Sequence, residues 1–432
     1  MDDDFMWAVG IEDTFIGQPH RRTGRVLDEY QLLDHYGLWR DDLDRLGELG
    51  VRFMRYGIPW YRVAPEAGRF DWSWTDQVVP HLVQRVGIEP IVDLMHYGCP
   101  IWLEGEFLNP GYPERVAEYA VAFAERYHGL VRYFTPLNEP VVNAFFCGQS
   151  GSWPPYLRGP RGYTRVLIAL AKGMSATISA LRAAVPDAVI VQVEASQRVV
   201  ADGAGLEHHV ERAFLKQFLP TDLVLGRVDA GHPMLGWLLD HRVATSDLDW
   251  LREHGQRIDI MGINFYPTMS TARISGEGDR PRSRNFYGSA TDLGVVLSAH
   301  YSHFGLPVMI TETSDFARVQ RRAQWMDDSV AGVRDARERG VPVVGYTWFP
   351  VYSHVGWDYR GGRRPLEAYI CDMGLWDIRA DSDGTFRRHR TPLVDRYAAL
   401  VAGGNASVGS IASVPAPAGH AAMTAPAPPT PS

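Results

Sequence analysis

The chain has 432 residues, of which 45% are hydrophobic, so it can bury a large core. Its net charge is −8 and its basic residues form no stripe or block, which argues against nucleic acid as a partner. The three cysteines are too few and too scattered for a disulfide framework or a cysteine-based metal site, and we expect no metal and no cofactor.

The two ends of the chain carry compositional signals. Residues 1–4 are acidic where a signal peptide would be basic, and no apolar segment follows them. No stretch approaches the length of a membrane span, so we expect a cytoplasmic protein without a membrane partner. Residues 403–432 contain six prolines and no Asp, Glu, Lys or Arg, which predicts a disordered Pro/Ala-rich tail after a folded domain of residues 1–402.

In chain order, apolar strand-like segments alternate with segments of helical period. Strands are predicted at residues 5–10, 51–56, 89–95, 133–137, 189–193, 258–264, 307–313 and 343–348. Helices are predicted at residues 39–49, 75–86, 116–127, 165–185, 206–219, 289–304, 326–339 and 392–401. Gly50, Gly87 and Gly129 follow the first three helices, as is typical of helix C-caps.

Strict alternation of strands and helices predicts the α/β class, with a single (β/α)8 TIM barrel. A doubly wound sheet also alternates, but the glycine-rich phosphate-binding turn expected after its first strand is absent. In a barrel, the chemistry lies at the carboxyl ends of the strands. The residues predicted at those ends are His96, Asn138, Glu139, Glu194, Asn264, Tyr266, Glu312 and Trp348.

Two of these residues, Glu139 and Glu312, are carboxylates that end apolar runs. Glu139 stands before Pro140, and a residue before proline is held in an extended conformation. Each carboxylate therefore has a fixed direction and little water around it. Two such groups are what a retaining glycosidase requires, one as proton donor and one as nucleophile.

The surrounding motifs resemble those of the family 1 glycoside hydrolases, retaining β-glycosidases built on this barrel. The run TPLNEP at residues 135–140 is similar to the family's T-F/L-N-E-P box, with one extra residue, and ITETS at residues 310–314 is similar to its I-T-E-N-G box. The resemblance implies that Glu139 is the acid/base, that Glu312 is the nucleophile and that Asn138 binds the sugar 2-hydroxyl.

Other positions follow from the same resemblance. Arg55 matches the arginine beside the nucleophile, and His96 matches the histidine that binds the sugar 3-hydroxyl. The run GINFY at residues 262–266 matches a box that contains Asn264 and ends in Tyr266, a hydrogen-bond partner of the nucleophile. Trp348 matches the strand-eight tryptophan under the sugar ring.

The sugar-selecting end departs from the family pattern. Phe15 stands where the family has a glutamine that binds the 3- and 4-hydroxyls, and Glu12 and Asp13 lie close by in sequence. After strand eight, only Trp357 and Asp358 resemble the family's sugar-binding residues. The resemblance therefore implies a β-glucosidase-like enzyme with an unusual or modified glycoside as its small-molecule substrate, with Glu194 as a further candidate for binding it.

Three other functions remain open. A transglycosidase would use the same intermediate with an alcohol in place of water. A non-catalytic sugar-binding barrel would not need both glutamates together with Arg55 and Tyr266. An isomerase or aldolase barrel is disfavoured because the two lysines, Lys172 and Lys216, lie at no strand end. The histidine pair 208–209 is read as part of a solvated helix face rather than a metal site.

Overall fold

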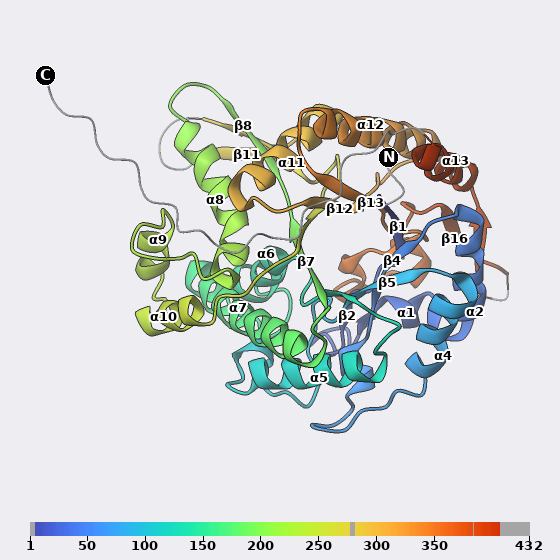
Figure 1. The fold of residues 1–432 in the computed structure, drawn as a ribbon, viewed down its shortest axis with the longest axis horizontal. Coiled ribbons are helices and arrows are strands. Elements are labelled where there is room, and N and C mark those ends of the chain that lie inside the picture. Colours follow the sequence, from blue (N-terminus) through green and yellow to red (C-terminus); the bar gives the residue numbers. More distant parts are fainter. Residues whose placement is uncertain (1–4, 277–280, 383, 407–432) are drawn as a thin grey trace, which may run out of the picture.

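The computed structural model describes residues 5–276, 281–382 and 384–406, and within them eight parallel strands close into a barrel (Figure 1). The neighbour order around the barrel is β1-β13-β12-β9-β7-β6-β5-β4, so the fold predicted from the alternation is confirmed. The barrel strands are β1 (Met6–Gly10), β4 (Phe53–Gly57), β5 (Glu89–Asp93), β6 (Tyr133–Thr135), β7 (Val189–Ala195), β9 (Ile260–Asn264), β12 (Val308–Thr313) and β13 (Val343–Trp348).

Helices surround this barrel, as Figure 1 shows. They are α1 (Glu29–Leu32), α2 (His35–Arg45), α3 (Trp60–Val63), α4 (Thr75–Pro80), α5 (Tyr112–Arg126), α6 (Pro140–Ala144), α7 (Gly159–Ala184), α8 (Glu207–Val224), α9 (Leu235–Asp240), α10 (Thr245–Glu253), α11 (Ala290–Phe304), α12 (Val319–Glu338) and α13 (Leu393–Ala406). Single turns of tighter or wider helix lie at Leu46–Leu49, His81–Val86, Glu106–Leu108, Phe145–Gln149, Trp357–Arg360 and Leu366–Tyr369.

Two boundaries differ from the sequence-based expectations. Helix α13 continues to Ala406, past the expected domain end at residue 402, and the rest of the predicted tail lies outside the described residues. By length and composition α7 is apolar enough to cross a membrane, so the expectation that no stretch reaches that length is wrong. Its most apolar window is 61% buried inside the protein, which is typical of a core helix.

The alternation of side chains along each strand divides the core into two layers. Phe53, Ile91, Val191, Ile260 and Met309 point into the barrel and pack together there. Their neighbours in sequence point outward and join the larger cluster between strands and helices. The same parity decides which strand-end residues can reach the barrel mouth.

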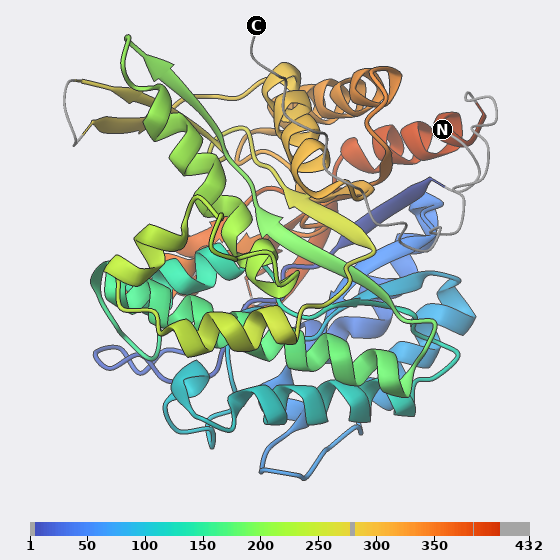
Figure 2. The same cartoon turned by 60° about the vertical axis from the view of Figure 1, so that its left-hand side comes forward.

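Short sheets lie outside the barrel. Strands β2 (Phe15–Ile16) and β3 (Leu27–Asp28) pair after β1, and β8 (Arg198–Asp202) pairs with the hairpin of β10 (Thr271–Ser275) and β11 (Arg282–Asn285). Figure 2 shows this second sheet extending beyond the barrel wall beside α8. After β13, strand β14 (His354–Val355) pairs with β15 (Ile370–Cys371), and β16 (Trp376–Ala380) pairs with β17 (Phe386–Arg390).

Candidate active site

Strand parity brings a set of polar side chains to the carboxyl end of the barrel. Arg55 and Asp93 lie two residues beyond the inward-facing Phe53 and Ile91, and Asn264 lies four beyond Ile260. Side chains two or four apart on a strand share a face, so all three point into the barrel mouth. All three are almost fully buried.

Glu312 is re-aimed by an irregularity of its strand. The pairing of β12 with both of its neighbours shifts register after Ile310, as a β-bulge does. One Glu312 carboxylate oxygen accepts from Arg55 Nη1 at 2.6 Å, and the other accepts from the Tyr266 hydroxyl at 2.7 Å. A fixed cation and a hydroxyl donor therefore hold the two oxygens of the predicted nucleophile.

Glu139 stands at the N-cap of α6 with a left-handed φ of 45°, so the extended conformation expected for this residue before proline is wrong. Non-glycine residues in this region are uncommon and concentrate at functional sites. Asn264 Nδ2 donates to one carboxyl oxygen of Glu139 at 2.8 Å, and the Tyr97 hydroxyl donates to the other. The second donor was not predicted from the sequence, although Tyr97 directly follows the candidate His96.

The two carboxyl groups have different electrostatic surroundings. Burial raises the pKa of Glu139 and of Glu312, and the negative charge of Glu139 raises the pKa of Glu312 further. The Arg55 cation contacts Glu312 and lowers the pKa there, whereas the direct donors of Glu139 are the neutral Tyr97 and Asn264. Direct contact with a cation therefore distinguishes Glu312 from Glu139, although burial still raises the pKa of Glu312 to about 8.

Asn138 connects the two halves of the site. Its Oδ1 accepts from Arg55 Nη2 at 3.1 Å and from Asn264 Nδ2 at 3.3 Å. Its Nδ2 donates to the Tyr97 hydroxyl at 3.0 Å and lies 2.9 Å from His96 Nε2. The predicted Arg55, His96, Asn138 and Asn264 thus form one hydrogen-bonded network around the glutamates.

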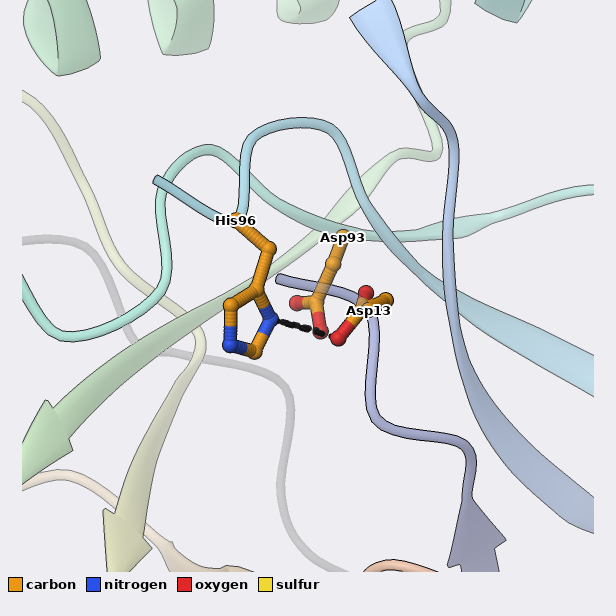
Figure 3. A group of neighbouring side chains, drawn as sticks. All are labelled: Asp13, Asp93 and His96. Carbon is orange, nitrogen blue, oxygen red and sulfur yellow. Dashed lines mark ion pairs between the residues drawn. The ribbon is translucent and has the colours of Figure 1, made fainter. Parts of the chain in front are cut away.

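Figure 3 shows the side chains of Asp13 and Asp93 together on one side of the His96 ring. Asp13 lies 2.6 Å and Asp93 3.7 Å from His96 Nδ1. Burial alone would lower the pKa of His96, but the two carboxylates more than offset it and raise that pKa well above its ordinary value.

Three such side chains in a cluster have the donor set of a small cation site. Arg55 Nη2, however, already occupies Asp93 Oδ2 at 2.5 Å. The fixed charge of the guanidinium disfavours a second cation beside it. The cluster fits better as an ion-pair network that orients Arg55 and His96.

Trp348 does not lie under the site, and its assignment as the platform for the sugar ring is wrong. Residues on a strand alternate faces, and Trp348 shares the outward face of β13 with Tyr346. Its indole nitrogen donates to the carbonyl of Met373 at 3.2 Å. The next residue, Phe349, points inward, where its ring stacks on His96 and lies 5.4 Å from the Arg55 guanidinium carbon.

Glu194 also faces away from the barrel interior. It lies on the opposite face of β7 from the inward Val191 and Val193, and Thr221 of α8 donates to its carboxylate at 3.1 Å. Burial raises its pKa well above the ordinary value. The expectation that Glu194 binds substrate is therefore wrong, because strand parity directs it into the layer between β7 and the helices.

In the segment after β1, the acidic residues face the site and Phe15 does not. Phe15 packs its ring against Tyr30 and Tyr61 at centroid distances of 5.0 and 6.5 Å and is buried in the core, so it does not stand in for a sugar-binding glutamine. Glu12 and Asp13 turn toward the site instead. The charge of Glu12 acts on Glu312 and on His96.

A second missed residue, His354, follows β13. It is buried, and within the described residues neither ring nitrogen has a hydrogen-bond partner. Burial lowers its pKa and the charge of Glu12 opposes that shift, so the two side chains are near neighbours. The expected Asp358 is exposed and lies 3.8 Å from Arg364, whereas Trp357 packs on Tyr97 at 5.5 Å. A buried imidazole without a side-chain partner can bond to water or to a polar ligand.

Comparison with known proteins bears on this geometry. The model of Glycosyl hydrolase family 1 matches residues 8–291. The thermostable beta-glucosidase B of Thermobispora bispora is 27% identical over 374 residues, which cover 77% of this chain and 75% of that protein. The bifunctional beta-D-glucosidase/beta-D-fucosidase of Bifidobacterium breve is 24% identical over 436 residues, which cover 88% of this chain and 91% of that protein.

Among solved structures, the family 1 β-glucosidase of Thermotoga maritima has a TM-score of 0.79 at 20% identity, with 94% of this chain and 98% of that chain covered. That likeness shows a shared fold. The family model spans more than half of the chain and ends before β12, so the strand that carries Glu312 lies beyond it. The chain belongs to glycosyl hydrolase family 1 and is a β-glucosidase-like glycoside hydrolase.

Proposed function

We propose that the protein is a retaining β-glycosidase that acts by double displacement, with Glu312 as nucleophile and Glu139 as acid/base. The observation that carries this proposal is the division of donors between the two carboxyl groups. Glu312 receives the cation Arg55 together with Tyr266, whereas Glu139 receives only the neutral donors Tyr97 and Asn264, and burial raises the pKa of Glu139.

The first step follows from this arrangement. The Glu312 carboxylate attacks the anomeric carbon while the glycosidic bond breaks, and Glu139 gives its proton to the departing oxygen. The negative charge of Glu312 is lost in the covalent intermediate, so the pKa of Glu139 falls and its carboxylate can accept a proton from water. Water then releases the sugar with retained configuration and restores both groups.

Substitution of Glu312 tests the nucleophile. Glu312→Gly should lower kcat by several orders of magnitude, because the covalent step disappears, while the protein stays folded. Added azide should restore turnover and give an α-glycosyl azide, since the small anion fits the vacated space and attacks the same face. The measurement is the rate with an activated aryl glycoside, together with the anomeric configuration of the product by NMR.

Wild-type enzyme in the same azide solution is the control and should show no comparable acceleration. A Glu312→Gly variant with nearly wild-type rate would remove this residue from the mechanism. Adding an alcohol to the wild-type reaction separates hydrolysis from transglycosylation, because a transglycosidase would return mainly the alkyl glycoside.

Glu12 and His354 are the residues that we expect to select the hydroxyl groups at the end of the sugar away from the glycosidic bond. Burial keeps the pKa of His354 below its ordinary value, so the ring is neutral and offers one donor and one acceptor. Glu12 adds carboxylate acceptors at 8% exposure. This end of the site therefore fits hydroxyl or amino groups. An apolar Phe15 in the pocket would favour a modified, deoxygenated glycone. That hypothesis has no support, because the Phe15 ring lies in the core.

A matched pair of substrates tests this assignment. An aryl β-galactoside and the corresponding β-fucoside differ by one hydroxyl group, and a site with buried polar groups rejects the analogue that leaves them unpaired. We expect kcat/KM to be at least about tenfold higher for the galactoside, from roughly 1–3 kcal/mol per unpaired group. The ratio should approach one in Glu12→Gln or His354→Ala. A wild-type enzyme that prefers the fucoside would contradict the assignment.

A further inference from the structure

A large cavity lies beside the catalytic network, and neither glutamate lines it. Its volume is about 1020 Å³, and it is bounded by the segments 20–22, 146–158 and 357–361. Its floor is aromatic: Phe146, Trp153 and Trp357 stack or meet edge to face, with ring centroids 4.5 to 5.6 Å apart.

The aromatic floor joins this cavity to the acid/base. The Tyr97 ring lies 5.3 Å from Trp153 and 5.5 Å from Trp357, and its hydroxyl donates to Glu139. One tyrosine therefore spans the distance between the cavity floor and the carboxyl group that acts on the glycosidic oxygen. The indole nitrogen of Trp357 has no hydrogen-bond partner within the described residues.

The cavity wall is strongly cationic although the chain as a whole is acidic. Arg21, Arg22, Arg158 and Arg360 line it, and in the described part of the chain no ion pair joins any of the four to a carboxylate. The acid in the same lining, Asp358, is exposed and lies beside Arg364 instead. Arginines gathered in a concave surface without acidic partners concentrate anions there.

Arg360 gives the strongest local signal. Its side chain is 2% exposed, and its guanidinium donates to neutral acceptors: the carbonyls of Gln18 and Ser152 and the hydroxyl of Tyr156. Its Nε has no partner within the described residues. Burial raises the pKa of the nearby Glu106 carboxyl group to about 7 and the charge of Arg360 opposes that rise, but no ion pair joins the two in the described part of the chain. A buried guanidinium without an ion-pair partner is costly unless a ligand brings the missing charge. Burial together with the positive charges of Arg360 and Arg22 lowers the pKa of His20 at the same wall.

We infer that this cavity binds an anionic group of the glycoside substrate, a carboxylate or a phosphate. The inference rests on the proposed function, because it assigns the substrate of that same site. The floor of aromatic rings carries the apolar part of the substrate, and Arg22, Arg158 and Arg360 hold the anion. The anion can belong to the aglycone or to the sugar, and the experiment separates these two sources.

The test measures binding, so it does not depend on turnover. Calorimetry gives Kd for three S-linked glycosides that resist hydrolysis: phenyl β-thioglucoside, its 4-carboxyphenyl analogue and phenyl β-thioglucuronide. We expect one of the two anionic ligands to bind about tenfold or more tightly than the neutral one, as charged hydrogen bonds do. A tighter carboxyphenyl ligand assigns the anion to the aglycone, and a tighter glucuronide assigns it to the sugar. The 6-phosphate of the neutral ligand tests phosphate in the same way.

Variants assign the effect to the cavity. Arg22→Gln combined with Arg158→Gln alters two exposed side chains and should remove the preference for the anion without changing Kd for the neutral ligand. Arg360→Lys keeps the charge of the buried position and should retain most of the preference. Arg284→Gln, an exposed arginine of β11 outside the lining, is the matched control and should change nothing. The preference should also weaken as NaCl rises.

Equal or weaker binding of all anionic ligands would overturn the inference, as would a preference that survives in the double variant. The azide experiment on Glu312→Gly decides the proposed function separately. Suppose that azide restores the activity of Glu312→Gly but that the neutral and anionic ligands bind the wild type equally well. The retaining mechanism would then stand, and only the inference of an anionic substrate would be wrong.

Discussion

Two tyrosines each donate a hydrogen bond to one of the two proposed catalytic carboxyl groups. Tyr266 donates to Glu312 and Tyr97 donates to Glu139, and burial raises the pKa of both phenols well above the ordinary value. Both tyrosines therefore remain neutral donors over the range of pH in which the enzyme would work. The two glutamates differ in their third neighbour, because Arg55 contacts Glu312.

If Glu139 is the general acid, the loss of rate on its substitution should depend on how much the leaving group needs a proton. Glu139→Ala should lower kcat/KM for an unactivated phenyl glycoside by about 10²–10⁴, the usual contribution of a general acid. An activated dinitrophenyl glycoside should lose far less in the step that forms the glycosyl-enzyme, because its leaving group departs without a proton. Steady-state rates on the two substrates give the comparison.

Glu194 provides the control for that experiment. It is a buried carboxyl group close in sequence to the site, and it faces α8 rather than the barrel interior. Glu194→Gln should leave the ratio between the two substrates unchanged. Equal losses on both substrates in Glu139→Ala would assign the proton to another group.

At the scale of single elements, β13 is a strand in which the sequence-based assignment is wrong by one position. The sequence predicts the strand correctly and indicates Trp348 as the platform for the sugar. In the structure, Phe349 faces Arg55 and His96 instead. On a strand, a shift of one residue exchanges the inward and outward faces. A motif match without a fixed register therefore cannot decide between Trp348 and Phe349. The outward contacts of Tyr346 decide it.

The loop after β1 shows a different limit. The sequence offered Glu12, Asp13 and Phe15 as neighbours, and only packing tells which of them turn inward. Phe15 joins Tyr30 in the core because burial of its ring is favourable, and this leaves Asp13 beside His96. Tyr97 and His354 carry no signal of their own in the motifs, although Tyr97 directly follows His96 and His354 lies three residues before Trp357.

The elements that were predicted well are those with strong local patterns. Barrel strands and their order follow from apolar runs and glycine-ended helices, and Arg55, Asn264 and Tyr266 follow from motifs whose spacing the strands preserve. The bulge in β12 and the left-handed backbone at Glu139 aim the two proposed catalytic carboxyl groups. Both are tertiary adjustments of one residue, so the sequence indicates the glutamates but not their directions.

At the scale of the whole molecule, the two ends of the described chain are joined by one buried carboxylate. Asp42 of α2 is fully buried and accepts from the Nε and Nη2 atoms of Arg388 on β17, each at 2.7 Å. His35 Nδ1 lies 2.9 Å from the same carboxylate, and the Tyr352 hydroxyl donates to the Asp42 backbone carbonyl at 2.6 Å. Elements far apart in sequence thus meet around Asp42, on the barrel side where α13 also packs.

This cluster predicts how the stability of the protein responds to substitution and to acid. Burial alone would raise the pKa of Asp42, but His35 and Arg388 lower it below its ordinary value. Asp42→Asn removes the anion and leaves a buried guanidinium without its partner. We expect the free energy of unfolding at pH 7 to fall by about 3–5 kcal/mol, the usual cost of breaking a buried ion pair. Thermal unfolding of the wild type and the variant measures the difference.

The pH dependence gives the sign of the effect. Because the folded-state pKa of Asp42 is depressed, its contribution is fully present above the unfolded-state value of about 3.9 and is lost as the pH falls through the folded-state value. The gap in melting temperature between wild type and Asp42→Asn should therefore stay constant from pH 7 to about 5 and narrow below about 4. Asp395→Asn, which removes an exposed partner of Arg390, is the control and should leave the melting temperature almost unchanged. If Asp42→Asn has the same melting temperature as the wild type at neutral pH, other contacts hold the two ends of the chain together.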